Sequence, residues 1–329
     1  MSPEYAHEIV CWLIKVLHKI PGVRQFFNFF YTTHHLKLKR NICGLTFENP
    51  IGLAAGFDKN AQLFNEFSSF GFGFIEVGTV TPLPQEGNPK PRLFRLKEDH
   101  AIINRMGFNN DGVDVVVNRL KKKYSNIIIG GNIGKNKITP NSSAVDDYLM
   151  CFDKIAPYVD YLVLNISSPN TPNLVELQDK LYLTTLLEKI QQLNRQSYNK
   201  PVFIKISPDL TFSQIDEVLV LIDQFKVSGI IATNTSSKRI NLKTPKYNIK
   251  KIGSGGLSGK PLFKRSLEVV AYIHKKNQSL PIVAVGGISN VDDAMKMFDA
   301  GASLIQLYTA FIYSGPSIVK NINNKLLRA

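Results

Sequence analysis

Eight short and almost uninterrupted apolar runs constrain the fold of this sequence more than any other feature. Runs of this length are typical of parallel strands that are covered on both faces. Amphipathic segments with helical spacing lie between them, for example residues 174–193, 213–225 and 263–274. The eight runs are residues 51–55, 74–79, 127–133, 161–166, 202–206, 229–234, 282–287 and 304–308.

Eight strand–helix units in one chain of 329 residues predict an α/β protein with the (β/α)8 or TIM-barrel fold. The alternative is a doubly wound open sheet, which usually carries a GxGxxG turn after its first strand. No such turn follows residues 51–55. We therefore expect the barrel.

Residues 1–40 differ in texture, and we expect them to form a helical hairpin ahead of a barrel domain of residues 41–329. Residues 4–20 have helical periodicity, with Ser2 as a possible cap. Residues 26–31 contain five aromatic side chains, which cannot all lie on one face of a helix. Two interpretations stay open: a cap packed on the barrel, or a hairpin in a membrane interface with its cationic residues near the headgroups.

The net charge of +14 favours anionic partners, but the basic runs are short and lack interleaved aromatic residues. We therefore expect no binding of nucleic acid. Cys11, Cys43 and Cys151 are far apart and have no metal-ligand spacing, so no metal is expected. No apolar stretch reaches the roughly 18 residues of a membrane-spanning helix, and the N-terminus lacks the basic region of a secretory signal.

Polar side chains follow nearly every predicted strand, at the end where TIM barrels carry their active sites. Any single one could be a loop residue that satisfies turn backbone, but the joint pattern indicates a site. Glycine-rich turns at residues 255–259 and 286–287 lie where this fold usually binds phosphate. The strand-end residues include Lys59, Thr79, Asn132, Asn165, Lys205, Asn234 and Thr309.

The predicted site is rich in amides and contains no histidine, paired carboxylates or metal ligands. Such a site suits a flat anionic molecule and leaves the electron chemistry to a cofactor. Together with the phosphate turns, this suggests FMN. Lys205 supports an anionic ligand, because a lysine inside the apolar run 202–206 is costly without one, although it could instead extend to solvent.

The sequence resembles the dihydroorotate dehydrogenases, in particular their class 2, quinone-reducing and membrane-associated branch. This resemblance implies oxidation of dihydroorotate to orotate in pyrimidine biosynthesis, with electrons passing through FMN to a membrane quinone. It covers nearly the whole chain. It is densest in residues 49–59, 78–96, 104–110, 165–172, 232–235 and 255–261.

The resemblance implies that Ser168 is the base that removes a proton from C5 of the substrate, while the hydride from C6 goes to flavin N5. Class 1 enzymes have a cysteine at this place, and none of the three cysteines of this chain falls there. Thr171 and an ordered water, screened by Phe108, would relay the proton. Without the resemblance, Ser167 and Ser168 are equally eligible.

The remaining roles also follow from the resemblance. Ala55, Gly56, Phe57, Asp58, Lys59, Thr79, Asn132, Asn165, Lys205, Thr233, Gly256, Gly287, Tyr308 and Thr309 would hold FMN. Lys59, Asn104, Arg105, Met106, Gly107, Phe108, Asn165, Asn170, Asn234 and Thr235 would hold the substrate. His7 and Arg95 would line a quinone tunnel formed with the hairpin. The family's usual Gly-Leu-Arg is replaced by Asn173-Leu174-Val175, so the resemblance does not fix the shape of the loop beside the base.

The class 2 resemblance further implies a peripheral membrane protein. The lack of a transit peptide favours the cytoplasmic face of the cell membrane, with the mitochondrial inner membrane as the alternative, and we expect a monomer. Two alternative functions fit the sequence less well. A tRNA dihydrouridine synthase would need a catalytic cysteine and an RNA-binding helical domain after the barrel, but the chain ends about twenty residues after the last predicted strand. A non-enzymatic membrane-surface protein would have lost the site residues, yet the whole set is present.

Overall fold

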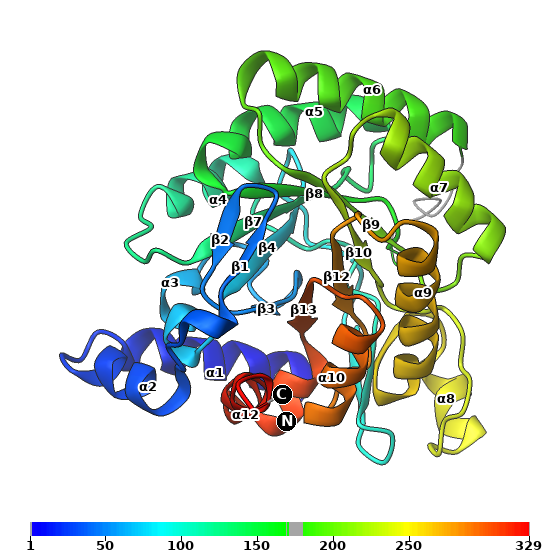
Figure 1. Cartoon of the computed structure of the whole chain (residues 1–329). Helices are drawn as coiled ribbons and strands as arrows, with labels where there is room; N and C mark the ends of the chain where they lie inside the picture. The colour runs from blue at the N-terminus through cyan, green and yellow to red at the C-terminus, as the bar shows by residue number, and fades with distance from the viewer. Residues whose placement is uncertain (1, 169, 171–179, 329) are drawn as a thin grey trace.

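A computed structural model describes residues 2–168, 170 and 180–328 of the chain (Figure 1). Eight parallel strands form a closed barrel in which every strand pairs with its neighbours in chain order. The prediction of a TIM barrel is confirmed, because each predicted apolar run contains one barrel strand. The barrel strands are β3 (Ile51–Leu53), β4 (Phe74–Val80), β7 (Ile128–Ile133), β8 (Tyr161–Asn165), β9 (Val202–Ile206), β10 (Gly229–Ala232), β12 (Ile282–Val285) and β13 (Leu304–Leu307).

Large rings close the barrel at the N-terminal ends of its strands. Phe74, Tyr161 and Phe203 lie there, with Phe47 from a β-hairpin stacked edge-on against Phe74 at 5.2 Å between ring centroids. The hairpin consists of β1 (Arg40–Ile42) and β2 (Leu45–Phe47). Glycines make room for the rings, since a Cβ on Gly52 would lie 2.3 Å from the Phe74 ring. Gly130 faces Tyr161 and Gly229 faces Phe203 in the same way.

Helices surround the barrel, and their apolar faces form the outer layer of the core (Figure 1). The predicted helices at 213–225 and 263–274 are confirmed as α7 and α9, while only the part of 174–193 from residue 180 onward falls within the described residues. The helices are α3 (Phe64–Phe67), α4 (Val113–Leu120), α5 (Ala144–Ile155), α6 (Lys180–Ser197), α7 (Phe212–Gln224), α8 (Lys246–Ile252), α9 (Phe263–Lys276), α10 (Val291–Asp299), α11 (Thr309–Ser314) and α12 (Ser317–Leu326).

A three-stranded antiparallel sheet, not foreseen from the sequence, is formed by β5 (Leu93–Leu96), β6 (Ala101–Asn104) and β11 (Gly256–Gly259). The sequence predicted a glycine-rich turn at residues 255–259. Residues 256–259 instead pair with β6, with Gly256 opposite Asn104. The glycines here allow close approach of two backbones, because a Cβ on Gly259 would lie 2.3 Å from the carbonyl oxygen of His100.

The N-terminal segment forms α1 (Pro3–Leu17) and α2 (Val23–Tyr31), and Ser2 caps α1 by accepting the N–H of Tyr5. One face of this pair packs on the core through Cys11, Ile14, Phe27 and Tyr31. The other face is apolar and exposed: it presents Tyr5, Val10, Trp12, Leu13, Phe26, Phe29 and Phe30.

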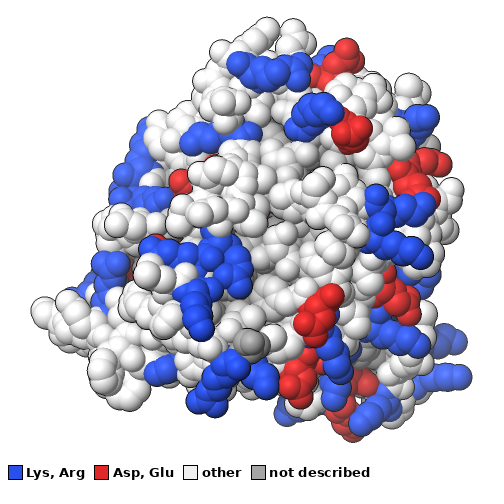
Figure 2. Space-filling model, in the orientation of Figure 1, with Lys and Arg blue, Asp and Glu red and all other residues white. Residues whose placement is uncertain are grey.

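The part of the molecule that projects at the lower left of Figure 2 is mostly white, without acidic or basic side chains at its tip in this view. Within the described residues, none of the helices combines the length and the apolar character needed to span a membrane. The division between residues 40 and 41 coincides with the start of β1 at Arg40, and as a domain boundary it stays a prediction.

Candidate active site

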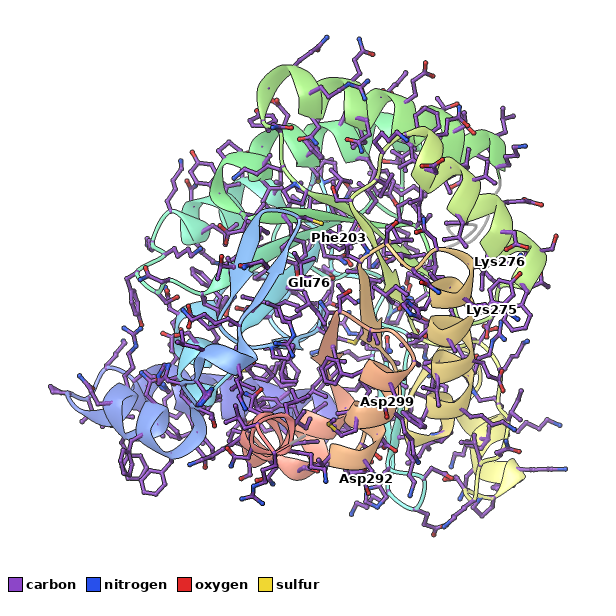
Figure 3. All side chains as sticks on the ribbon, in the orientation of Figure 1. Glu76, Phe203, Lys275, Lys276, Asp292 and Asp299 are labelled. Carbon is purple, nitrogen blue, oxygen red and sulfur yellow. The ribbon has the colours of Figure 1, made fainter. Side chains whose placement is uncertain are left out.

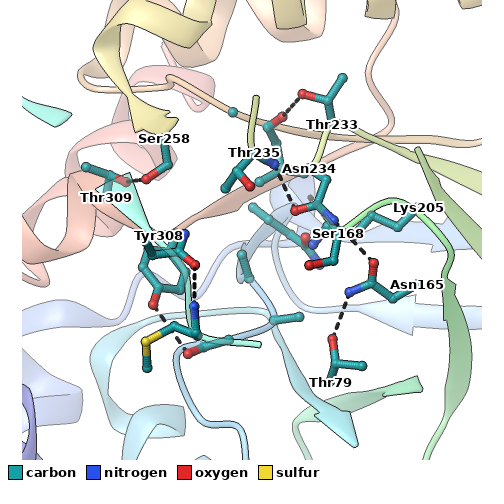
Figure 4. Close-up of a pocket in the computed structure, with 18 of the residues that line it drawn as sticks. Thr79, Asn165, Ser168, Lys205, Thr233, Asn234, Thr235, Ser258, Tyr308 and Thr309 are labelled. Atoms are coloured by element: carbon teal, nitrogen blue, oxygen red, sulfur yellow. Dashed lines mark hydrogen bonds between the residues drawn. The ribbon is translucent and has the colours of Figure 1, made fainter. Parts of the chain in front are cut away.

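A pocket opens at the C-terminal ends of the barrel strands, under the three-stranded sheet (Figure 4). Its walls come from the segments after β3, β4, β8, β10, β12 and β13, together with β6 and β11. The predicted gathering of strand-end residues is therefore present in space. Among the residues that line it are Ala55, Gly56, Lys59, Thr79, Asn104, Met106, Gly107, Phe108, Asn165, Ser168, Asn170, Lys205, Thr233, Asn234, Thr235, Gly287, Tyr308 and Thr309.

Amide side chains form a connected network along one wall. Asn165 donates its Nδ2–H to Thr79 Oγ1 at 2.8 Å, and its Oδ1 accepts from Asn234 Nδ2 at 3.2 Å. On the opposite rim, Asn170 Nδ2 donates to Asn104 Oδ1 at 3.0 Å. Because each amide is held by a neighbour, the donors and acceptors of the pocket are fixed before any ligand arrives, which favours specific recognition of a polar ring.

The two adjacent serines have different surroundings. Ser167 is fully buried behind the wall, donates its hydroxyl to the Lys205 carbonyl at 2.6 Å and accepts from Asn234 Nδ2 at 3.1 Å. Ser168 lines the pocket, and among the described residues its Oγ accepts a long bond of 3.3 Å from the N–H of Asn170. The geometry therefore distinguishes the two serines, since only the hydroxyl of Ser168 faces a ligand.

Lys59 is a half-buried cation in the wall of the pocket. Burial lowers the pKa of its ammonium group to about 8, and the positive charge of Arg92 lowers it further, while Glu4 opposes the shift. Near neutral pH the group is still mainly protonated. It therefore offers the pocket a positive charge with little solvation, which suits a carboxylate.

Lys205 enters the pocket from within the barrel, where its Nζ lies 3.7 Å from Oε1 of the fully buried Glu76. The two amides Asn132 and Gln306 donate to the same carboxylate, at 2.7 Å and 2.5 Å. Figure 3 places Glu76 inside the ring of strands, away from the charged side chains on α9 and α10. Glu76 and Gln306 were missed from the sequence, although a carboxylate inside the apolar run 74–79 is the same signal that singled out Lys205.

Backbone and hydroxyl groups line the end of the pocket formed after β12. Gly287 has φ +80°, and a Cβ there would lie 2.2 Å from the backbone nitrogen of Phe263, the first residue of α9. Thr309 and Ser258 share a hydroxyl hydrogen bond of 3.0 Å nearby. Glycine backbone packed closely against the start of a helix, together with hydroxyl donors, is suited to a phosphate group.

The profile of the dihydroorotate dehydrogenase family matches residues 37–329. The chain is 53% identical over 328 residues to the dihydroorotate dehydrogenase (quinone) of Christiangramia forsetii, covering 99% of this chain and 95% of that protein. It is 45% identical over 340 residues to the protein of that name from Thermosynechococcus vestitus, covering 100% and 92%. The chain belongs to the dihydroorotate dehydrogenase family. It is therefore an oxidoreductase.

A solved structure supports the same assignment. The crystal structure of DHODH in complex with ferulenol from Eimeria tenella superposes with a TM-score of 0.88 at 39% sequence identity. The match covers 99% of this chain and 91% of that one. The barrel, the small sheet and the N-terminal helices therefore all fall within the part that is shared with a dihydroorotate dehydrogenase.

Four residues expected at FMN do not line the pocket: Phe57, Asp58, Asn132 and Gly256. The Asp58 carboxylate accepts the backbone N–H groups of Gln62 and Leu63, both at 2.8 Å, so it holds the turn that carries Lys59. Asn132 lies behind the wall and accepts from Thr79 Oγ1 at 2.5 Å. Asp58 and Asn132 therefore support residues that line the pocket and do not line it themselves.

Arg105, expected at the substrate, also points away from the pocket of this dihydroorotate dehydrogenase. Its guanidinium group donates to the Ile252 and Ser254 carbonyls and lies over the Phe94 ring at 4.6 Å. Thr171 and the segment Asn173-Leu174-Val175 lie outside the described residues.

The two residues expected in the quinone tunnel differ in position. His7 on α1 packs edge-on against Phe57, with 5.1 Å between ring centroids, directly beside the pocket-lining Gly56. Burial, followed by the charge of Lys59, lowers the pKa of His7 to about 4, so its imidazole is neutral at physiological pH. Arg95 lies exposed on β5, the strand against which α1 packs.

Proposed function

We propose that this chain oxidises dihydroorotate to orotate, in de novo pyrimidine synthesis, and passes the electrons through FMN to a membrane quinone. The observation that carries the proposal is one pocket in which Ser168, two lysines and the asparagine network face the same space. The relatives named dihydroorotate dehydrogenase (quinone) match 92–95% of their own length, which supports the transfer of the whole activity.

The residues of the pocket fit FMN in two respects. Gly287, Thr309 and the start of α9 offer a cradle for the phosphate, and Lys205 offers a cation within the barrel for the ring. Ala55, Gly56, Thr79, Asn165, Thr233 and Tyr308 would enclose the remainder. FMN, when bound, supplies the acceptor for the hydride that leaves C6 of dihydroorotate.

The chain's own residues would bind and deprotonate the substrate. Lys59 would pair with its carboxylate, and Asn104, Asn170, Asn234 and Thr235 would hydrogen-bond its ring. Ser168 would take the proton from C5 and pass it to water. Phe108, which is buried and lines the pocket, would screen that water from bulk solvent.

For the second half of the reaction we propose that a quinone approaches along α1. His7 would donate a hydrogen bond from a neutral imidazole, and Arg95 would lie at the mouth. The exposed apolar face of α1 and α2 would rest in a membrane interface, with the protein peripheral and monomeric. We propose the cytoplasmic face of the cell membrane as its location, with the mitochondrial inner membrane as the alternative.

Anaerobic mixing with dihydroorotate tests the proposal directly. The purified protein should show a visible flavin spectrum that bleaches when dihydroorotate is added without an acceptor, and a ubiquinone analogue should restore the colour. Fumarate and NAD should leave it bleached. A colourless protein, or a yellow one indifferent to dihydroorotate, would contradict the proposal.

The binding of dihydroorotate should weaken above pH 8, because Lys59 loses its proton there. A lysine whose pKa is about 8 is charged below that value and neutral above it, so KM should rise by up to about tenfold per pH unit on the alkaline side. Steady-state KM between pH 6.5 and 10 measures the effect. Lys59→Met should raise KM at every pH and remove the alkaline limb, whereas a flat wild-type profile would show that Lys59 does not hold the carboxylate.

A further inference from the structure

Glu76 is a carboxylate at the centre of the barrel, and the proposed steps of the reaction do not use it. It has no exposed surface, and its oxygens face one ammonium group and two amide donors. An isolated carboxylate in such a place would be very costly, but these three close partners match an ionised one. Glu76 and Lys205 therefore form a buried ion pair.

The pair is asymmetric with respect to the pocket. Lys205 and Gln306 both line it, whereas Glu76 lies one layer deeper and is separated from the ligand space by these two side chains. A charge inside a dry barrel acts over several ångströms with little screening. The electric field at the floor of the pocket therefore has two opposing contributions. The nearby Lys205 ammonium group supplies the positive one, and the slightly more distant Glu76 carboxylate supplies the negative one.

We propose that Glu76 tunes the reduction potential of the bound flavin by attenuating the field of Lys205. This inference rests on the proposed function, in which FMN occupies the floor of the pocket. Reduced FMN carries a negative charge that Lys205 stabilises, and the carboxylate of Glu76 opposes that stabilisation. Glu76 is thus a positioning residue that acts through Lys205: it holds the ammonium group in place, and it lowers the potential that the lysine alone would set.

A buried ammonium group without a negative partner is unfavourable in free energy, and the oxidised, neutral flavin would offer Lys205 no such partner. Glu76 supplies the missing partner for that half of the cycle. Asn132 fixes the carboxylate and also reaches Thr79 in the pocket wall, so the ion pair and the amide network share one rigid support.

Three variants test the proposal by the reduced-to-oxidised ratio of the flavin at equilibrium with a redox dye, read from visible absorbance without turnover. Glu76→Gln should raise this ratio at least tenfold, which corresponds to about 30 mV for a two-electron couple. Lys205→Met should lower it at least tenfold. The double variant Lys205→Met/Glu76→Gln should return to within threefold of the wild type, because both charges are gone.

The double variant also protects the test against misfolding, since removing a buried ion pair as a whole is usually tolerated better than removing one partner. If Glu76→Gln does not fold, the comparison of Lys205→Met with the double variant still decides. Equal ratios in those two proteins, or an unchanged ratio in Glu76→Gln, would overturn the proposal. The exposed Glu217→Gln on α7 serves as the charge-removal control and should leave the ratio unchanged.

Bleaching of the wild-type protein by dihydroorotate is measured first. If that fails, the proposed function fails, and the variants are not informative about Glu76. If the wild type bleaches and the dye equilibria do not shift, only the inference about Glu76 is lost.

Discussion

Ser168→Ala is expected to slow the bleaching of the flavin by dihydroorotate about a thousandfold, while FMN stays bound. A positioned general base contributes on the order of 10²–10⁴ in rate, and alanine cannot accept the C5 proton. Within the described residues the Ser168 hydroxyl is held by a long bond from Asn170, so its removal should not disturb the pocket. Stopped-flow absorbance under anaerobic conditions measures the rate, and the flavin-to-protein ratio shows that the cofactor is retained.

Ser167→Ala is the matched control for this experiment. Its hydroxyl is buried and already bonded to the Lys205 carbonyl, so its loss should change bleaching by less than about tenfold. Ser168→Cys should retain more activity than Ser168→Ala, because a thiol also accepts a proton. Rapid bleaching of Ser168→Ala would remove the base from the proposal.

Glu4→Gln is expected to detach α1 from the barrel, at a cost of about 3 kcal/mol or more in the free energy of docking. Glu4 and Arg92 form a largely buried pair, in which Nη2 donates to Oε1 at 2.7 Å and Nε donates to Oε1 at 3.0 Å and to Oε2 at 3.3 Å. The variant leaves the charge of Arg92 buried without a carboxylate. Hydrogen exchange in α1 and the KM for a quinone analogue should both rise, and bleaching by dihydroorotate should change less.

The Glu4–Arg92 pair also makes the docking of α1 on the barrel weaker at acid pH. Burial would raise the pKa of Glu4, but the hydrogen bonds and charge of Arg92 outweigh it and hold the pKa below 4.5. A carboxyl with a lowered pKa stabilises the docked state above its ordinary pKa, and this contribution is lost as the pH falls below that value.

Glu8→Gln is the control, because the side chain of Glu8 is 55% exposed and lies 3.6 Å from an exposed lysine. It should change stability by less than about 0.5 kcal/mol. Equal hydrogen exchange in Glu4→Gln and Glu8→Gln would show that the buried pair does not hold the helix.

The barrel itself could be predicted from the sequence, because near-continuous apolar runs report burial on both faces without any knowledge of their partners. The small sheet could not. β11 pairs with β6 across about 150 residues, and its glycine-rich sequence looks like a turn until that partner is known. When glycines are required so that two strand backbones can approach closely, the sequence of the strand lacks the apolar residues by which a strand is usually recognised.

The sequence predicted which strand ends surround the site, but not which side chains line the pocket and which lie behind its wall. Strand-end position correctly placed Lys59, Asn165 and Ser168 around one space, but it could not separate the lining residues from those one layer behind, such as Asp58 and Asn132. That distinction depends on where each side chain turns after the strand ends. The choice between Ser167 and Ser168 likewise required their hydrogen-bond partners.

The aromatic rings at the N-terminal ends of the barrel strands have a consequence for how ligands enter and leave the pocket. Phe74, Tyr161 and Phe203 fill that end, so the described residues leave the pocket open toward the C-terminal ends of the strands. Under the proposed function, both substrates and the product would be exchanged there, beside α1 and the small sheet. A molecule bound there for one half of the proposed reaction would then delay the other half, so each substrate is expected to inhibit the half-reaction of the other.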